Sequence, residues 1–174
     1  MDQIFLAFLE NTAADAAELQ QKSDLLTLRG IPPMPASKYE CCFRVPYLRR
    51  MPTGIVVMDP GPVHFTITFP NNYLRSTDPS LGMRVAFIAS PGFLHPNVLS
   101  GAVCLGGQFA PGTPIEALAW ELFEIVTYRN CTLDHALNQE ACRLIREYPS
   151  LLEAMGRPSL RRSDRSVHVS VRPA

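Results

Sequence analysis

The stretch His95-Pro96-Asn97-Val98-Leu99-Ser100-Gly101-Ala102-Val103-Cys104-Leu105 decides how the rest of the sequence is interpreted. It lies within residues 91–114, which are rich in Gly and Pro and have little hydrophobic periodicity. Pro96 stiffens the backbone and restricts the preceding histidine to an extended conformation. Asn97 supplies an amide donor, and glycines near Cys104 allow backbone N–H groups to approach whatever the sulfur holds. A nucleophilic sulfur beside a hydrogen-bond donor suits acyl transfer.

The segments before this stretch predict a helix followed by strands. Residues 1–29 are rich in strong helix formers, with Asn11 or Thr12 as the N-cap, and the prolines after Gly30 end that helix. Four strands are then predicted from alternating or β-branched runs. Pro46 suggests that the first of these strands lies at an edge or ends early. Residues 59–62 are predicted to form a tight turn between the second and third strands. The strands are expected over Tyr39–Leu48, Gly54–Met58, Val63–Phe69 and Met83–Ala89.

Two helices are predicted after the stretch. Thr113 is expected to cap a helix that begins at Pro114 and carries apolar residues at helical spacing as far as Val126. A second helix is expected over residues 137–148. The predicted order is a helix, a four-stranded antiparallel meander, a long loop and C-terminal helices. This order is typical of the α+β class with segregated helices.

The composition of the 174 residues fits one domain, with 47% hydrophobic residues and a formal net charge of zero. We expect this domain to cover residues 1–156 and an arginine-rich tail to cover residues 157–174, in which Val167–Val171 alternates like a strand. A neutral chain gives no reason to expect nucleic-acid or membrane binding. The acidic start and the short apolar run of the first ten residues give no export signal, so a cytoplasmic location is expected.

The sequence contains five cysteines, an odd number in a chain of this length, so a disulfide framework is not expected. None of them lies at zinc-ligand spacing from another cysteine or a histidine, so we expect no metal and no cofactor. Four of the five, all but Cys104, are expected in the core as small hydrophobic residues. They are Cys41, Cys42, Cys131 and Cys142.

The order of these elements and several local motifs resemble the ubiquitin-conjugating enzymes over residues 15–155. His95-Pro96-Asn97 matches the family's HPN motif, and Val103-Cys104-Leu105 resembles its I/V-C-L motif. Residues 69–73 (FPNNY) resemble F-P-x-x-Y, residues 109–111 (FAP) stand where the family has W-x-P, and residues 134–138 (DHALN) resemble D-D-P-L-N. Nine positions separate the histidine from the cysteine, whereas the family usually has ten.

This resemblance implies a role for each candidate residue. Cys104 would carry a ubiquitin-like protein as a thioester. Asn97 would either stabilise the oxyanion during aminolysis or order the loop around Cys104. His95 and Pro96 would brace that loop. Asp134 and His135 would stand where the family often has acids that orient the incoming amine, although Asp134 could instead cap a turn.

The resemblance also implies partners: a ubiquitin-like protein, an activating enzyme and a protein substrate. The family meets its activating enzyme through the N-terminal helix, where we expect Phe5, Phe8 and Leu9 to form an exposed apolar stripe. The shortened loop suggests a divergent, bacterial relative in a ubiquitin-like conjugation pathway, several of which are linked to antiphage defence.

Two other functions remain open from the sequence. One is a non-catalytic scaffold of the same fold that binds a ubiquitin-like protein, although known relatives of that kind lack the cysteine. The other is a cysteine hydrolase that pairs Cys104 with His95 or His135, for which no hydrolase signature is present.

Overall fold

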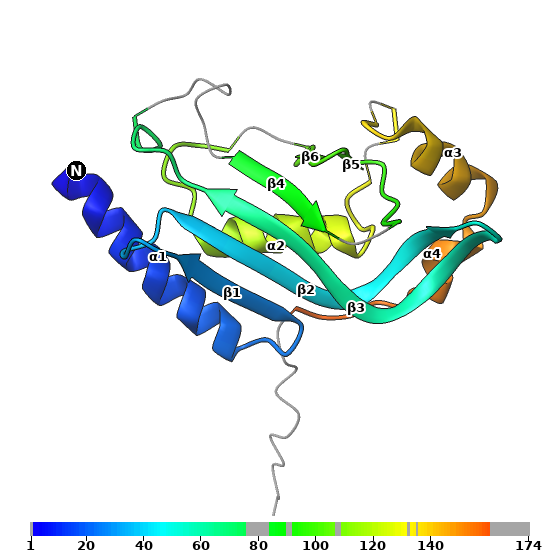
Figure 1. The fold of residues 1–174 in the computed structure, drawn as a ribbon, viewed down its shortest axis with the longest axis horizontal. Helices are drawn as coiled ribbons and strands as arrows, with labels where there is room; N and C mark the ends of the chain where they lie inside the picture. Colours follow the sequence, from blue (N-terminus) through cyan, green and yellow to red (C-terminus); the bar gives the residue numbers. More distant parts are fainter. Residues whose placement is uncertain are drawn as a thin grey trace, which may run out of the picture.

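The computed structural model of the chain describes residues 2–75, 84–89, 92–106, 109–131, 133–134 and 136–160. A long N-terminal helix precedes the strands, and shorter helices follow them (Figure 1). The elements are α1 (Gln3–Gln21), β1 (Leu26–Ile31), β2 (Lys38–Met51), β3 (Gly54–Thr68), β4 (Arg84–Ala89), β5 (Val98–Leu99), β6 (Ala102–Val103), α2 (Ile115–Val126), α3 (Gln139–Glu147) and α4 (Ser150–Ala154).

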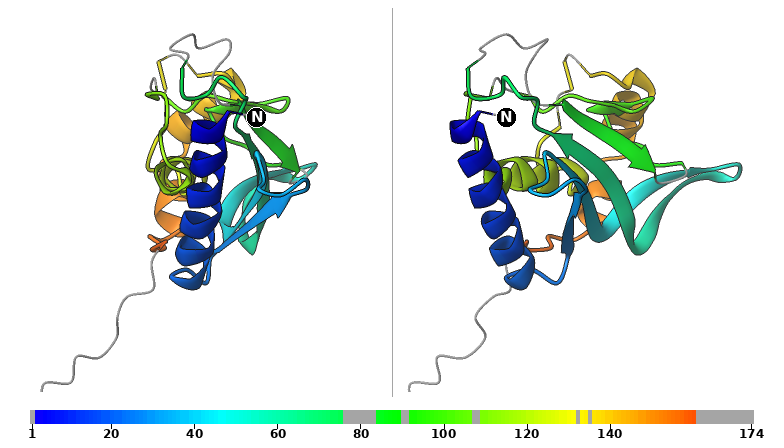
Figure 2. Two further views of the ribbon diagram at one scale, coloured as in Figure 1. Left: turned by 90° about the vertical axis from the view of Figure 1, so that its left-hand side faces the viewer. Right: turned by 60° about the vertical axis from the view of Figure 1, so that its left-hand side comes forward.

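The strands form one antiparallel sheet in the order β1-β2-β3-β4-β6-β5 (Figure 1). Helices α1 and α2 contact each other and cover the same side of this sheet, as the side view in Figure 2 shows. The predicted α+β class, with an N-terminal helix, an antiparallel meander and C-terminal helices, is therefore confirmed.

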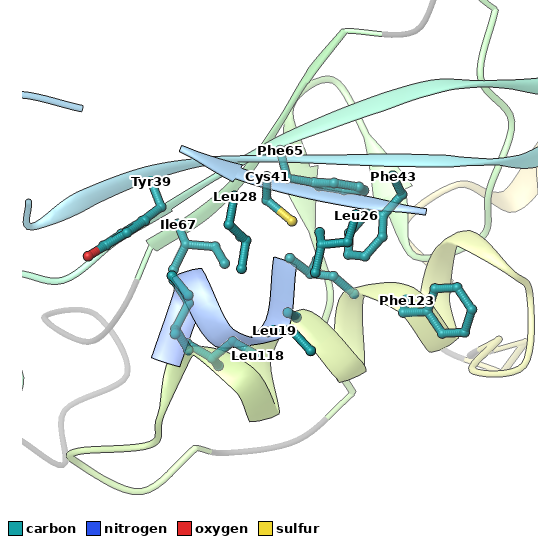
Figure 3. Packing of buried hydrophobic residues seen from close by; sticks show 14 of the residues in the cluster. Leu19, Leu26, Leu28, Tyr39, Cys41, Phe43, Phe65, Ile67, Leu118 and Phe123 are labelled. Atoms are coloured by element: carbon teal, nitrogen blue, oxygen red, sulfur yellow. The ribbon is translucent and has the colours of Figure 1, made fainter. Parts of the chain in front are cut away.

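The main core lies between the sheet and these two helices (Figure 3). Phe43 and Phe65 from β2 and β3 are fully buried and meet edge to face, with ring centroids 6.3 Å apart. They pack towards Leu19 of α1 and towards Leu118 and Phe123 of α2. Because alternate strand residues point to opposite faces, the other face of β2 and β3 is left partly open to solvent.

The N-terminal helix is shorter than predicted. A helix was expected over residues 1–29, but α1 ends at Gln21 and the segment after it forms β1, in which buried and exposed residues alternate. The N-cap is Asp2, whose carboxylate accepts the Ile4 N–H at 3.0 Å, so the predicted caps Asn11 and Thr12 are wrong. Both of those residues lie inside the helix.

The two middle strands of the prediction form one long strand, β3, so the turn predicted at residues 59–62 is wrong. Pro46 does not end β2 either. The register between β2 and β3 shifts between Val45 and Tyr47, at the position of Pro46 and opposite the proline-containing segment of β3. Prolines are tolerated at such an irregularity because the ladder hydrogen bonds are already interrupted there.

The C-terminal boundary of the packed domain also differs from the prediction. Leu160 is fully buried in the main core cluster, and Arg129 donates a hydrogen bond to the Pro158 carbonyl. The boundary predicted after residue 156 is therefore too early, because the packed domain reaches at least Leu160. The strand-like alternation at residues 167–171 lies outside the described residues.

The helices after the long loop begin close to their predicted positions. α2 begins at Ile115 after Pro114, while the predicted cap Thr113 instead donates its hydroxyl to the Ala110 carbonyl at 2.7 Å. α3 begins after Asn138, whose side-chain oxygen accepts the Ala141 N–H at 3.0 Å.

Candidate active site

A tight hairpin places Cys104 at the edge of the sheet. Strands β5 and β6 pair with each other, and Ala102 of β6 also pairs with Ala86 of β4. The two turn residues, Ser100 and Gly101, have positive φ angles of 50° and 87°. This is the backbone pattern of a two-residue hairpin turn, which glycine adopts at little cost. Cys104 follows β6 directly and is partly exposed.

Asn97 holds the backbone of Cys104 in two places. The Cys104 N–H donates to the Asn97 carbonyl at 2.8 Å, and the Asn97 side-chain Nδ2 donates to the Cys104 carbonyl at 3.0 Å. Asn97 is fully buried. Of the two roles predicted for its amide, the geometry supports the ordering of the loop that holds the sulfur.

His95 is a buried brace whose ring stays neutral. Burial lowers its pKa to about 3, and a hydrogen bond to the Ile125 backbone only partly offsets that effect. Its Nδ1 accepts the Asn97 N–H at 3.0 Å, so the other ring nitrogen carries the proton. That nitrogen lies 3.7 Å from the sulfur of Cys131. A histidine held this way is unsuited to act as a general base near pH 7, and the geometry supports the predicted bracing role.

Tyr128 is a brace that the sequence analysis missed. Its ring packs against His95 with centroids 4.4 Å apart. Its hydroxyl donates to the Leu94 carbonyl and accepts the Leu48 N–H, the latter at 3.3 Å. Tyr128 therefore ties the segment before the HPN motif to β2. No local motif marks it, because its partners lie 34 and 80 positions away.

Asn138 is a second brace without a predicted role. Its backbone N–H donates to the Pro96 carbonyl at 2.9 Å, and its side-chain nitrogen lies 3.5 Å from the Val98 carbonyl. Because Asn138 also caps α3, it connects that helix directly to the HPN segment. The motif at residues 134–138 was the available signal.

The predicted gate residues are only partly described. Asp134 is on the surface, where its side chain is 91% exposed and forms an ion pair with Arg146 at 3.4 Å. His135 lies outside the described residues. The role of both residues in orienting an amine stays a prediction.

The apolar stripe predicted on α1 for partner binding is not present. Phe5 and Leu9 are 2% and 0% exposed, so their proposed role as contact residues is wrong. Phe8 is only partly buried, but its ring packs into the chain's own aromatic cluster with Phe69 and Tyr73. The amphipathic face of α1 is used for the core.

The other four cysteines differ in how deeply they are buried. Cys41 and Cys142 are buried, as predicted, whereas Cys42 and Cys131 are partly exposed. Burial raises the pKa of Cys131 to about 12, so its thiol stays protonated. Among the described residues, no group of three or more histidine, cysteine or acidic side chains is arranged to hold a metal ion.

The fold matches solved structures of ubiquitin-conjugating enzymes. One is the E2 domain of a Toxoplasma gondii ubiquitin conjugating enzyme, with a TM-score of 0.56 and 15% identity, covering 84% of this chain and 92% of that one. Another is described as a novel ubiquitin-conjugating enzyme, with a TM-score of 0.57 and 18% identity, covering 85% and 89%. No family model and no curated protein matches the sequence.

The chain therefore has the α+β fold of ubiquitin-conjugating enzymes, and the resemblance predicted from its motifs is confirmed at the level of the fold. None of the helices that the structure describes has the length and apolar character needed to cross a membrane.

Proposed function

We propose that this protein carries a ubiquitin-like protein as a thioester on Cys104 and transfers it to an amine of a target protein. The observation that supports this most is the way Cys104 is presented. Its side chain is partly exposed, while its backbone is held on both sides by the buried Asn97 of the HPN motif. The surrounding fold is that of enzymes that perform this reaction.

The reaction needs one sulfur and two acyl transfers. In the first, the Cys104 thiolate attacks the carbonyl carbon of the modifier's thioester on an activating enzyme, and that enzyme's thiolate leaves. In the second, a target amine attacks the new thioester, the Cys104 thiolate leaves and an amide bond forms. The amine's proton passes to solvent or to a nearby base. The Cys104 thiolate is regenerated for another cycle.

Because His95 is neutral and already hydrogen-bonded, it is not the residue that would take a proton from the attacking amine. With a pKa of about 3 and Nδ1 already accepting a hydrogen bond, it has no free lone pair for a target amine. A hydrolase that uses Cys104 with this histidine is therefore disfavoured. We assign the orientation of the amine to Asp134 and His135 instead.

We further propose that the chain works with a ubiquitin-like protein, an activating enzyme and a protein substrate. Its placement in a bacterial conjugation pathway, with a link to antiphage defence and a cytoplasmic location, is a prediction from the divergent loop and the composition. Since Phe5 and Leu9 are buried, recognition of the activating enzyme must use other residues.

The test is a charging reaction with an activating enzyme and modifier that have been shown to charge another carrier. With ATP present, we expect an adduct on a non-reducing gel that is lost on adding thiol. Cys104→Ala should form no adduct. Cys104→Ser is the matched variant, because an oxygen ester at the same position should survive thiol but not strong base.

Each outcome separates the candidate functions. A thiol-sensitive adduct that then passes its modifier to free lysine supports the carrier. No adduct with several active pairs of enzyme and modifier would support the scaffold. Rapid loss of the adduct to water, with no transfer to added amine, would support a hydrolase.

A further inference from the structure

A cavity lies where the tip of the β2–β3 hairpin meets α3 and α4 (Figure 1). Its volume is about 520 Å³, within the range of about 300–1,000 Å³ that is typical of small-molecule sites. The lining comes from residues 50–55 on the hairpin and from residues 140–151 on the helical side. The proposed function uses none of the side chains that line this cavity.

One part of the lining is apolar and only partly buried. Ile55 of β3, Leu144 of α3 and Leu151 of α4 line the cavity and pack against a second core cluster that includes Leu48. Tyr148, which is 55% exposed, lines the cavity between the two helices. Apolar ligand atoms that cover these side chains would remove their surface from water, which favours binding. The lining therefore suits a ligand with an apolar body.

The charged part of the lining is positive. Arg50 on β2 and Arg143 on α3 line the cavity from opposite walls, and Glu140 also lines it, so two arginines and one glutamate leave a net charge of +1. Glu140 pairs with Arg50. The ion-pair partner of Arg143 is Glu147, whose carboxylate is 3.9 Å away, too far for a direct hydrogen bond. Arg143 therefore keeps guanidinium N–H groups for a ligand.

We propose that this cavity binds a small amphipathic anion, with its apolar body against the leucines and Ile55 and one oxyanion group between Arg50 and Arg143. A guanidinium group is planar and presents several N–H donors, which matches the oxygens of a carboxylate, sulfonate or phosphate. The same two arginines disfavour a cationic ligand. The proposal does not depend on the function of Cys104.

Both walls of the cavity are attached to the segment that leads into the HPN motif. The backbone N–H of Arg50 donates to the Gly92 carbonyl at 2.8 Å. On the other wall, Glu140 follows two positions after Asn138, whose N–H holds the Pro96 carbonyl. A ligand that contacts both walls stabilises the folded arrangement of hairpin and helix, because it binds only the folded chain. We therefore expect it to raise the unfolding temperature.

The test uses two fluorescent probes with the same aromatic body. Anilinonaphthalene sulfonate carries one sulfonate group, and N-phenylnaphthylamine is the same ring system without it. Each probe is titrated into the full-length protein, and its fluorescence rises when water is excluded from its rings. We expect the sulfonate to bind more tightly than the neutral probe and to raise the unfolding temperature. Added salt should weaken only the sulfonate, because it screens partly exposed charges.

Three variants locate the binding. Arg143→Gln should weaken the sulfonate about fivefold, the upper end for an exposed ion pair, and leave the neutral probe unchanged. Leu151→Trp places a larger ring in the cavity and should weaken both probes. Arg146→Gln is the matched control, because this arginine lies on the same helix but pairs with Asp134, which does not line the cavity. It should bind both probes like the original protein.

Circular dichroism establishes that each variant is folded. Equal affinity for the two probes overturns the proposal and would favour an apolar segment of a partner protein as the occupant. Sulfonate binding that is unchanged in Leu151→Trp, or that falls as much in Arg146→Gln as in Arg143→Gln, places the anion elsewhere and also overturns it.

Discussion

Replacing Asn97 with alanine removes the side-chain hydrogen bond that holds the Cys104 carbonyl at 3.0 Å. Because this hydrogen bond is partly buried, the carbonyl loses its partner without full access to water, which costs about 1–3 kcal/mol of unfolding free energy. A misplaced loop also slows chemistry at the sulfur. A positioning loss of about 1.4 kcal/mol corresponds to a tenfold lower rate.

We therefore expect Asn97→Ala to slow charging and discharge by a similar factor, about tenfold. Thermal unfolding measures the stability change, and single-turnover gels measure the two rates separately, with free lysine as the acceptor. Asn138→Ala is the comparison variant, because it removes the side-chain contact with the Val98 carbonyl and keeps the backbone hydrogen bond to the Pro96 carbonyl.

The opposite pattern would refute this reasoning. If Asn97→Ala leaves stability and charging unchanged but lowers discharge by about 10²–10³, the amide acts on the reacting carbonyl, as an oxyanion donor does. The contact with the Cys104 carbonyl would then describe only the uncharged protein. Asn138→Ala should not reproduce that selective loss.

Three further predictions concern stability. His95 should make the folded state acid-sensitive, because its folded pKa of about 3 lies below the ordinary 6.5. Its contribution to the unfolding free energy is present above pH 6.5 and falls by about 1.4 kcal/mol per pH unit below it. Urea unfolding between pH 6.5 and 4 measures this, and the unfolding free energy of His95→Asn should fall less steeply with decreasing pH. Gly101→Ala, at φ 87°, should lower the unfolding free energy by about 1 kcal/mol, as measured by thermal unfolding. Ser100→Gly, at φ 50°, should lower it less or raise it. Equal losses in the two variants would contradict the hairpin geometry. Leu160→Ala should cost about 2–5 kcal/mol in urea, and no change would place the domain's end before residue 160.

The sequence was most informative where a pattern is local. Alternation in the segment from Val63 to Phe69 predicted which residues of β3 enter the core, because successive strand residues point to opposite faces. The HPN and V-C-L motifs located the candidate nucleophile and the asparagine that holds it. Both signals are carried by residues close together in the chain.

It was less informative where a local preference is overridden by distant partners. Residues 26–29 follow a strong helix and are predicted from the sequence to continue it, but pairing with β2 makes them part of strand β1. The apolar face of α1 was correctly recognised as apolar, yet periodicity does not say whether such a face meets a partner protein or the chain's own sheet. Phe5 and Leu9 meet the sheet's core.

The active-site loop shows why a motif alone predicts a nucleophile but not its support. Within residues 95–104 the local contacts include those between His95, Asn97 and Cys104. Further supports come from outside this segment, through the pairing of Ala102 with Ala86 of β4, the ring and hydroxyl of Tyr128, and the N–H of Asn138. The sulfur of Cys104, the proposed nucleophile, thus lies on a loop whose geometry depends on distant parts of the chain. Substitutions of the Tyr128 side chain should affect charging, although Tyr128 contacts neither the modifier nor the target in the proposed reaction.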